Sequence, residues 1–270
     1  MIDPSRYLIR PGTRVDLSDH DPADSGEFED GKKEGKAALP GIVKEMAELQ
    51  RRLWAESSRS LLVILQALDT GGKDGTIRHV FGGVNPQGVH VMGFGPPTNR
   101  ERAHDFLWRI HQQTPEKGAI TVFNRSHYED VLVVRVKELV PEPLWSRRYE
   151  HIRAFERLLA DEGTTIVKVY LNISKEEQRR RLQRRLDRPD KRWKFQNDDL
   201  EDRTLWDSYV EAYEDAITET AVDHAPWYVV PADRKWYRNL VVASLVARTL
   251  QRMDPHYPDP EEGLEGVEVT

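Results

Sequence analysis

The residues best suited to chemistry lie between Leu61 and Thr76, in the stretch LLVILQALDTGGKDGT. An apolar, β-favouring run over 61–66 leads into a loop with paired glycines and one lysine, and then into residues that can start a helix. This order is typical of a phosphate-binding loop, in which backbone N–H groups and the positive end of the helix dipole face an anion. Lys73 would add a positive charge. The backbone around the phosphate would come from Gly71, Gly72, Gly75 and Thr76.

The loop departs from the usual pattern G-x-x-x-x-G-K-S/T at two positions. Ala67 stands at the first glycine, Asp74 replaces the hydroxyl residue, and Asp69 adds a second carboxylate. Two carboxylates beside a bound phosphate would repel it unless Mg²⁺ lies between them or one of them orients a nucleophile. We therefore expect Asp74 to contact Mg²⁺ directly or through water, and Asp69 to act as an orienting group or base. The alternative is a glycine-rich turn that only joins a strand to a helix.

A second group, NRSHYED, runs from Asn124 to Asp130 and follows an apolar strand expected over 119–123. A phosphotransferase of this kind needs an acid at the end of a neighbouring strand to hold Mg²⁺ or its waters. Asn124 occupies that place, so Glu129 or Asp130 would take the role, and Arg125 could neutralise phosphoryl charge. The alternative is that these charges only cap the helix that follows.

A third group is the basic stretch from Lys175 to Lys194, which holds ten Lys or Arg and four acidic residues in a chain of net charge −6. Arg181, Arg184 and Arg185 lie about one helical turn apart and can project from one side. Such a face suits a lid over a polyanion, because one arginine can donate two parallel hydrogen bonds to phosphate oxygens and closure excludes water. The alternative is a solvated helix surface. On a separate helix, Arg109 is a further candidate for phosphate binding.

These groups need a scaffold, and the chain offers an alternation of strands and helices. This alternation predicts a parallel sheet with helices on both faces, and ligands in such folds bind at the carboxyl ends of the strands. Both loop motifs occupy that edge. The expected strands are 61–66, 88–94, 119–123, 164–173 and 227–230. The expected helices are 39–57, 98–113, 144–161, 175–186, 198–222 and 236–253.

Composition bounds the remaining possibilities. The 270 residues suit one large α/β domain over 39–255, with an N-terminal arm over 1–38 and a loose tail over 256–270. The chain has no cysteine, which excludes thiolate catalysis and disulfides, and its acidic balance gives no general attraction to nucleic acid. No apolar run is long enough to span a membrane, so a cytoplasmic protein is expected. A Trp- and Tyr-rich helical surface makes a homo-oligomer plausible.

Together the three groups resemble the polyphosphate kinase 2 family over about residues 25–255. The residues that carry the resemblance are Leu68–Thr76, Phe123–Val131, Glu177–Leu182 and Lys191–Phe195. The resemblance implies a P-loop kinase-like three-layer α/β/α fold with a five-stranded parallel sheet and a helical lid at about 175–200. It also implies Mg²⁺ dependence and transfer of the terminal phosphoryl group of inorganic polyphosphate to a nucleoside phosphate.

Within this resemblance Asp69, Lys73 and Asp74 fall on the family's Walker A positions and Arg125 on its Walker B arginine. Many members carry Asp-Arg-Ser at the second motif and Asn-Arg shortly after it. The residues present here, Asn124 at the start and Glu129 with Asp130 further on, are similar to the branch that accepts both AMP and ADP. This difference leaves open which acid replaces the missing aspartate as metal ligand.

The resulting hypothesis assigns three roles to the predicted site. The loop and Lys73 hold the acceptor phosphate of AMP or ADP, Asp69 positions the attacking oxygen, and arginines clamp the polyphosphate end. It requires Lys73 and the arginines of 181–185 to face one cleft. The predicted metal ligands are Asp69, Asp74 and Asp130. The predicted nucleotide contacts beyond the loop are Arg109, Asn124 and Glu129, and the predicted polyphosphate contacts are Arg125, Arg181, Arg184, Arg185 and Lys194.

Two other functions fit parts of the pattern. An ATP-dependent nucleoside monophosphate kinase shares the loop, sheet and lid, but needs a second nucleoside pocket in place of a long cationic groove. A nucleotide- or nucleic-acid-binding module without catalysis would leave the loop carboxylates without a purpose.

Overall fold

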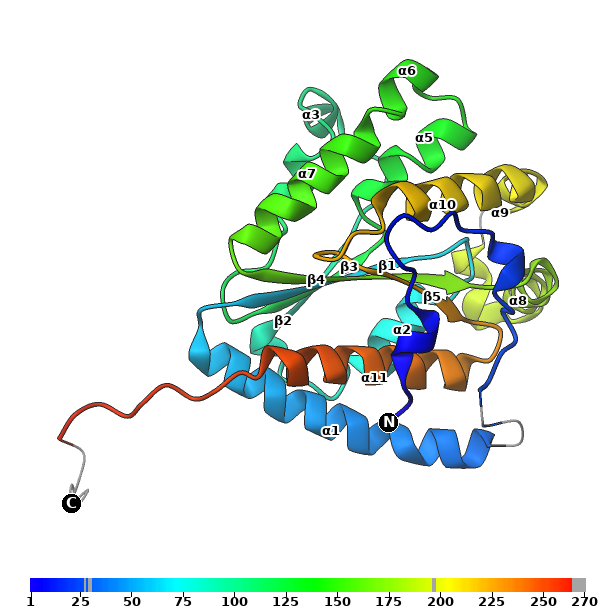
Figure 1. Cartoon of the computed structure of the whole chain (residues 1–270). Coiled ribbons are helices and arrows are strands. Elements are labelled where there is room, and N and C mark those ends of the chain that lie inside the picture. The colour runs from blue at the N-terminus through cyan, green and yellow to red at the C-terminus, as the bar shows by residue number, and fades with distance from the viewer. Residues whose placement is uncertain (27, 29–30, 196–197, 264–270) are drawn as a thin grey trace.

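The computed structural model describes residues 1–26, 28, 31–195 and 198–263, and its centre is a five-stranded parallel sheet (Figure 1). The strand order is β2-β3-β1-β4-β5, so the strand that leads into the glycine loop lies in the middle. All seven residues of that strand are buried, as an unbroken apolar run predicts for a strand covered on both faces. The strands are β1 Ser60–Gln66, β2 Val89–Gly93, β3 Ile120–Asn124, β4 Thr164–Asn172 and β5 Trp227–Pro231.

Helices cover both faces of the sheet and make the three layers that the sequence predicts (Figure 1). One face is covered by α1 (Lys32–Glu56), α2 (Lys73–Val80) and α11 (Lys235–Met253). The other is covered mainly by α7 (Arg148–Asp161) and α10 (Trp206–Thr220). Alternate residues of β1 enter the two cores, because successive side chains of a strand point to opposite faces.

The register of the sheet places the two loop motifs side by side. β1 and β3 are parallel neighbours with Leu65 opposite Asn124, so the glycine loop and the NRSHYED motif leave the sheet at the same carboxyl edge. β4 flanks β1 on its other side and leads into the basic helix α8 (Lys175–Asp187). The topology alone therefore brings all three sequence groups to one edge.

The segment before α1 lies along the β5 side of the sheet (Figure 1). Its contacts with the strand are the backbone hydrogen bond from Ile9 N to Trp227 O, 2.9 Å, and an isolated bridge between Leu8 and Tyr228. Further along, the backbone N–H of Leu17 donates to Glu214 of α10 at 2.7 Å. Of the expected arm and tail, residues 27, 29–30 and 264–270 lie outside the described residues.

Four of the expected helices differ from the sequence prediction: one begins earlier, and three are divided in two. α1 begins at Lys32 instead of residue 39 and continues through Pro40. The helix expected over 98–113 is two short helices, because the Asp105 side chain accepts from Leu107 N and starts a new turn. The helices expected over 144–161 and 198–222 are each divided as well. The segments concerned are α3 Asn99–Arg102, α4 Trp108–His111, α6 Glu142–Trp145 followed by α7, and α9 Asp198–Thr204 followed by α10.

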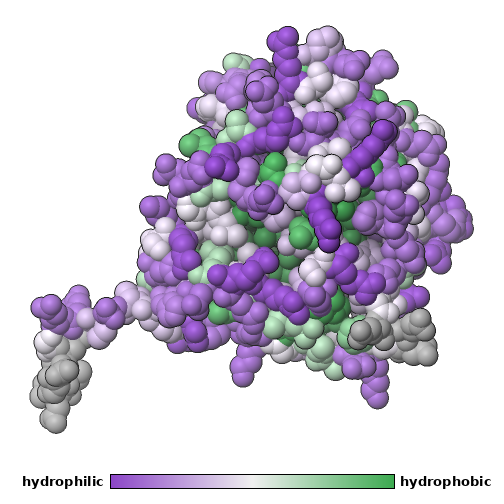
Figure 2. All heavy atoms as spheres, in the orientation of Figure 1, coloured by the Kyte–Doolittle hydropathy of each residue, from purple (hydrophilic) through white to green (hydrophobic). Residues whose placement is uncertain are grey.

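The remaining elements are short. They are α5 Val133–Val136 and the 3₁₀ helices η1 Pro4–Tyr7, η2 Leu17–Asp19, η3 Pro86–Gly88, η4 His127–Asp130 and η5 Pro189–Lys194. On the face shown in Figure 2, hydrophilic side chains predominate and the hydrophobic ones gather mainly in the middle, over the sheet. Within the described part of the chain, no helix combines the length and apolarity that a membrane crossing requires.

Candidate active site

A cavity of about 1000 Å³ opens at the carboxyl edge of the sheet, around the glycine loop. Among the described residues, eleven Lys or Arg side chains and three Asp line it. Lys73 and the arginines Arg181, Arg184 and Arg185 all belong to its wall, so they face one cleft as the hypothesis requires. A cavity with this excess of positive charge attracts and concentrates polyanions.

The glycine loop has the backbone conformation of an anion-binding loop. Gly72 has φ +109°, a value that side chains disfavour, and α2 begins at the next residue, Lys73. A Cβ at Gly71 would lie 2.5 Å from the Cβ of Ala67, so the close turn also requires glycine there. The first turn of α2 thus presents its free N–H groups at the cavity.

The Lys73 side chain folds back along the loop. Its Nζ donates to the carbonyl oxygen of Ala67 at 2.8 Å, and the residue is only 9% exposed. Burial, and next the positive charge of Arg125, lower the pKa of Lys73 to about 8, against the opposing effect of Asp69. A phosphate in the loop would add the negative charge that favours the protonated form.

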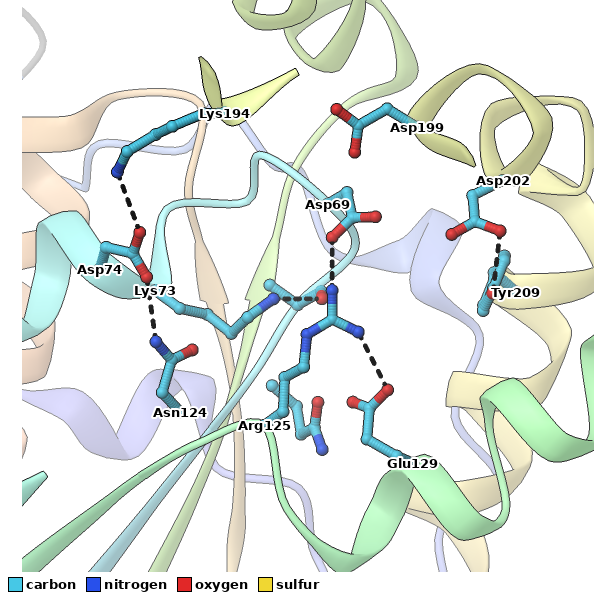
Figure 3. A network of polar contacts seen from close by, with 12 residues as sticks. Asp69, Lys73, Asp74, Asn124, Arg125, Glu129, Lys194, Asp199, Asp202 and Tyr209 are labelled. Atoms are coloured by element: carbon cyan, nitrogen blue, oxygen red, sulfur yellow. Dashed lines mark hydrogen bonds and ion pairs between the residues drawn. The ribbon is translucent and has the colours of Figure 1, made fainter. Parts of the chain in front are cut away.

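Arg125 joins the two loop motifs. It contacts Asp69 Oδ1 through Nη2 at 2.7 Å and Glu129 Oε2 through Nη1 at 3.1 Å (Figure 3). Its backbone has φ +63° and donates from N to Leu65 O of β1, which directs the chain out of β3 toward the glycine loop. The Glu129 carboxylate, helped by that of Asp69 and opposed by burial, raises the pKa of Arg125 above its ordinary value.

Asp74 forms a second link, on the other side of Lys73. It accepts from Asn124 Nδ2 at 2.9 Å and pairs with Lys194 Nζ at 3.4 Å (Figure 3). Partial burial raises the pKa of Asp74, but the hydrogen bond from Asn124 and the charge of Lys194 outweigh it and the pKa is lowered. The second motif has Asn124 where an acidic residue was expected. The Asn124 amide instead binds the carboxylate of Asp74, which comes from the glycine loop.

Of the predicted lid arginines, Arg181 is already bound by acceptors of the protein itself. It pairs with Glu177 at 2.8 Å and donates to the loop carbonyls of Thr70 and Gly71 and, on the other side, to those of Ala232 and Asp233. Arg185 contacts Asp199 at 3.3 Å. Arg184 lines the cavity, and no ion pair ties it to any described residue.

Asp130 and Arg109 are not part of the described cavity wall. Asp130 pairs with Arg148 at 3.1 Å and lies 4.0 Å from Arg109, whose Nη1 donates to Gly95 O at 2.8 Å. Burial raises the pKa of Asp130 despite these two arginines. These contacts link both residues to the Gly95 backbone and to α7 beside the cavity, and the predicted roles of Asp130 in metal binding and of Arg109 in phosphate binding stay predictions.

A buried polar network holds the η4 turn from behind. Lys168 of β4 and Glu156 of α7 are both fully buried and lie 2.6 Å apart between Nζ and Oε2. The hydroxyl of Tyr128 donates to Glu156 and accepts from Lys168, each at 2.9 Å. Because Tyr128 lies in η4, this network fixes the turn that carries Glu129 and directly follows Arg125 and Ser126.

The sequence analysis missed the residues that α1 and α11 bring to the cavity. They line the cavity and come from segments far from the three motifs: Lys36, Lys235, Trp236, Arg238 and Asn239. A contribution from α11 could have been predicted, because this helix follows the carboxyl end of β5 and thus begins at the edge of the sheet where ligands bind.

The carboxylates at the cavity fit a magnesium ion that takes only part of its ligands from the protein. Within the described chain, no three His, Asp or Glu residues are placed to enclose a metal. Asp69 and Asp74 do line the cavity, at opposite ends of the glycine loop. Mg²⁺ keeps several waters and is commonly held by one or two carboxylates plus substrate phosphates, and this donor set suits that arrangement.

The fold and this site define a kinase of the P-loop type: a parallel sheet with a phosphate loop at the end of its central strand, under a basic helical lid. The chain belongs to the polyphosphate kinase 2 family, whose model, "Polyphosphate kinase 2 (PPK2)", matches residues 29–258. The resemblance inferred from the motifs and the P-loop kinase-like fold are both confirmed.

Individual relatives are similar over nearly the whole chain. The AMP/ADP-polyphosphate phosphotransferase of Meiothermus ruber is 56% identical over 264 residues, which cover 98% of this chain and 99% of the relative. The ADP-polyphosphate phosphotransferase of Rhodopseudomonas palustris is 42% identical, with 96% and 93% covered. The crystal structure of polyphosphate kinase 2 from Arthrobacter aurescens TC1 matches with a TM-score of 0.93 at 43% identity, with 97% and 94% covered.

Proposed function

We propose that this protein transfers the terminal phosphoryl group of inorganic polyphosphate to AMP and ADP. The observation that carries the proposal is the cavity itself, in which many cations surround a glycine loop and only a few carboxylates. Family membership and the names of the two relatives, which refer to AMP and ADP or to ADP, support the same reaction.

In this reaction a phosphate oxygen of the acceptor attacks the terminal phosphorus of the chain. The new P–O bond forms as the bond to the penultimate phosphate breaks, so the chain leaves shortened by one phosphate. The attacking phosphate has a second pKa near 6 and is already deprotonated near neutral pH. Asp69 is therefore needed for orientation more than for removing a proton.

The protein's own contribution is positioning and charge neutralisation. The N–H groups of the glycine loop and the Lys73 ammonium hold phosphate oxygens on both sides of the transfer, so the loop contacts the acceptor phosphate and the terminal phosphate of the polyphosphate chain. Arg125 is fixed by Asp69 and Glu129, so its remaining N–H groups face the cavity at a constant place. Lys194 reaches across from the lid side and pairs with Asp74, which places its positive charge at the cavity beside the loop.

Asp69 and Asp74 would hold Mg²⁺ together with substrate phosphates. When bound, the ion would neutralise charge that develops on the transferring phosphoryl group. Asp130, which the sequence suggested as a third ligand, is engaged by Arg148 instead.

The test is an incubation of the protein with Mg²⁺, polyphosphate and either AMP or ADP, without ATP, followed by separation of the nucleotides. Formation of ADP and then ATP from AMP is the expected result. Transfer to AMP only when ATP is supplied would replace the proposal with a nucleoside monophosphate kinase. Binding of nucleotide or nucleic acid without turnover from either donor would point to a non-catalytic module.

A further inference from the structure

Two arginines are buried beside the glycine loop, and only one of them is neutralised. Arg181, from α8, has the Glu177 carboxylate 2.8 Å from its Nε and four backbone carbonyls around its other nitrogens. Its guanidinium is saturated by the protein. This arginine therefore braces the loop and has little capacity left for a ligand.

Arg238, from the first turn of α11, is in a different position. It is 2% exposed, and its acceptors are the Asn239 side-chain oxygen at 2.8 Å and the Gly71 carbonyl at 3.3 Å. No carboxylate among the described residues pairs with it. Removing a guanidinium from water without a counter-charge is costly, so a fold does not keep such a group merely for packing.

The loop is shaped around this arginine. A Cβ at Gly72 would lie 1.8 Å from Arg238 Nη1, and one at Gly75 would lie 3.2 Å from Nη2. The guanidinium thus lies against the backbone of the residues whose N–H groups begin α2, and it forms part of the cavity wall. It is placed to share an anion with the loop.

The positive charge extends beyond Arg238. Arg184 and Lys235 line the same side of the cavity, and neither forms an ion pair with any residue that the structure describes. Burial, and next the charge of Arg181, lower the pKa of Arg238 to about 9. Burial and the neighbouring arginines Arg181, Arg184 and Arg238 lower the pKa of Lys235 to about 8. The cluster is electrostatically unfavourable without an anion.

We propose that Arg238 is a phosphate-binding residue of the donor site: a phosphate of the polyphosphate chain held at the glycine loop supplies the negative charge that Arg238 lacks. Arg184 and Lys235 hold the following phosphates, so the chain extends between α8 and α11. The inference rests on the proposed function for the identity of the donor, while the binding of an inorganic phosphate chain is testable without turnover.

The test uses binding of inorganic tripolyphosphate to the full-length protein, measured by titration calorimetry without nucleotide. Arg238→Met should weaken binding at least tenfold, and Arg238→Lys should bind with intermediate affinity because it keeps the charge but loses the forked geometry. Arg248→Met is the matched control, because Arg248 lies on the same helix and pairs with Asp3 at the surface. Its affinity should equal that of the original protein.

A stability measurement separates a binding role from a structural one. If Arg238 has no counter-charge until an anion binds, the Tm of Arg238→Met in phosphate-free buffer should be no lower than that of the original protein. The substitution removes an uncompensated buried charge. It should also lose most of the rise in Tm that tripolyphosphate causes in the original protein. In steady-state assays the KM for polyphosphate should rise at least tenfold and the KM for AMP less than about threefold.

Unchanged tripolyphosphate affinity in Arg238→Met, or in Arg238→Lys if the methionine variant does not fold, would overturn the inference. A methionine variant that melts much lower and binds tripolyphosphate normally would identify Arg238 as a second structural brace. If the original protein binds tripolyphosphate through Arg238 but transfers no phosphate to AMP or ADP, the proposed function fails and this binding site stands.

Discussion

Arg125 Nη2 lies 2.7 Å from Asp69 Oδ1, although the two residues are 56 positions apart in the chain. The contact joins the loop that follows β1 to the motif that follows β3, and it orients a carboxylate and a guanidinium at the same cavity.

Replacement of Asp69 by Asn should lower kcat by two or more orders of magnitude, on the scale of ~3 kcal/mol. The amide keeps the size of the side chain but loses the charge that holds Arg125 and orients the attacking oxygen. Steady-state kinetics with saturating AMP and polyphosphate measure the effect. Asp161→Asn is the control, because Asp161 pairs with Arg157 on the exposed surface of α7. Near-normal turnover of Asp69→Asn would remove Asp69 from the mechanism.

Asp74 and Asp130 should differ in their effect on the magnesium requirement. Asp74→Asn should raise the Mg²⁺ concentration that gives half-maximal rate by about tenfold or more, a typical loss when a contact to a metal site is weakened. Asp130→Asn should leave that concentration unchanged and lower the free energy of unfolding by about 1–3 kcal/mol, since Arg148 and Arg109 lose the negative charge of a partly buried acceptor. An equal shift in both variants would place Asp130 in the metal site after all.

The rate should depend on pH through Lys73. The side chain is protonated below its pKa of about 8 and neutral above it, so kcat/KM for polyphosphate should fall as pH rises through about 8. Lys235 has a pKa of about 8 as well and must be distinguished. In Lys235→Met the fall should occur at the same pH with a lower overall value. Loss of the fall in that variant would assign it to Lys235.

The buried pair behind the η4 turn should matter greatly for stability. Lys168→Met leaves the Glu156 carboxylate buried without its cation, which should lower the free energy of unfolding by about 3–5 kcal/mol. The double variant Lys168→Met with Glu156→Leu removes both charges and should recover much of that loss. Urea unfolding followed by circular dichroism gives the comparison. If the double variant is no more stable than the single one, the network acts through shape more than through charge.

The strands could be predicted because burial on both faces requires an unbroken run of apolar residues, whereas the order of the strands in the sheet was not predicted. The run over 61–66 is apolar throughout, and β1 occupies Ser60–Gln66. The basic helix could also be predicted, since its run of charged residues is a local signal, and α8 covers Lys175–Asp187. Interruptions such as the one at Asp105 were not visible, because a single side-chain hydrogen bond competes there with a favourable helical pattern.

Many residues of the site could be predicted from the sequence, but their hydrogen-bond partners could not. Lys73, Arg125 and the 181–185 arginines reach one cavity because β1, β3 and β4 end at one edge of the sheet and α2 and α8 begin there. Spacing could not reveal that Arg181 is saturated by carbonyls of Thr70 and Ala232, which come from two distant loops. Arg238 could not be predicted for the same reason, since only the packing of α11 against the glycine loop brings it to the cavity.

The carbonyl contacts of Arg181 also restrict how the entrance can open. They tie the first two turns of α8 to the glycine loop and to the segment after β5, so this part of the helix cannot swing away without breaking buried hydrogen bonds on two sides. The hinge for substrate exchange is therefore expected beyond it, near Arg188 and Pro189, where the helix gives way to η5. Trp193 and Lys194 of η5 line the cavity beyond this point, and none of the four carbonyl contacts of Arg181 holds them in place.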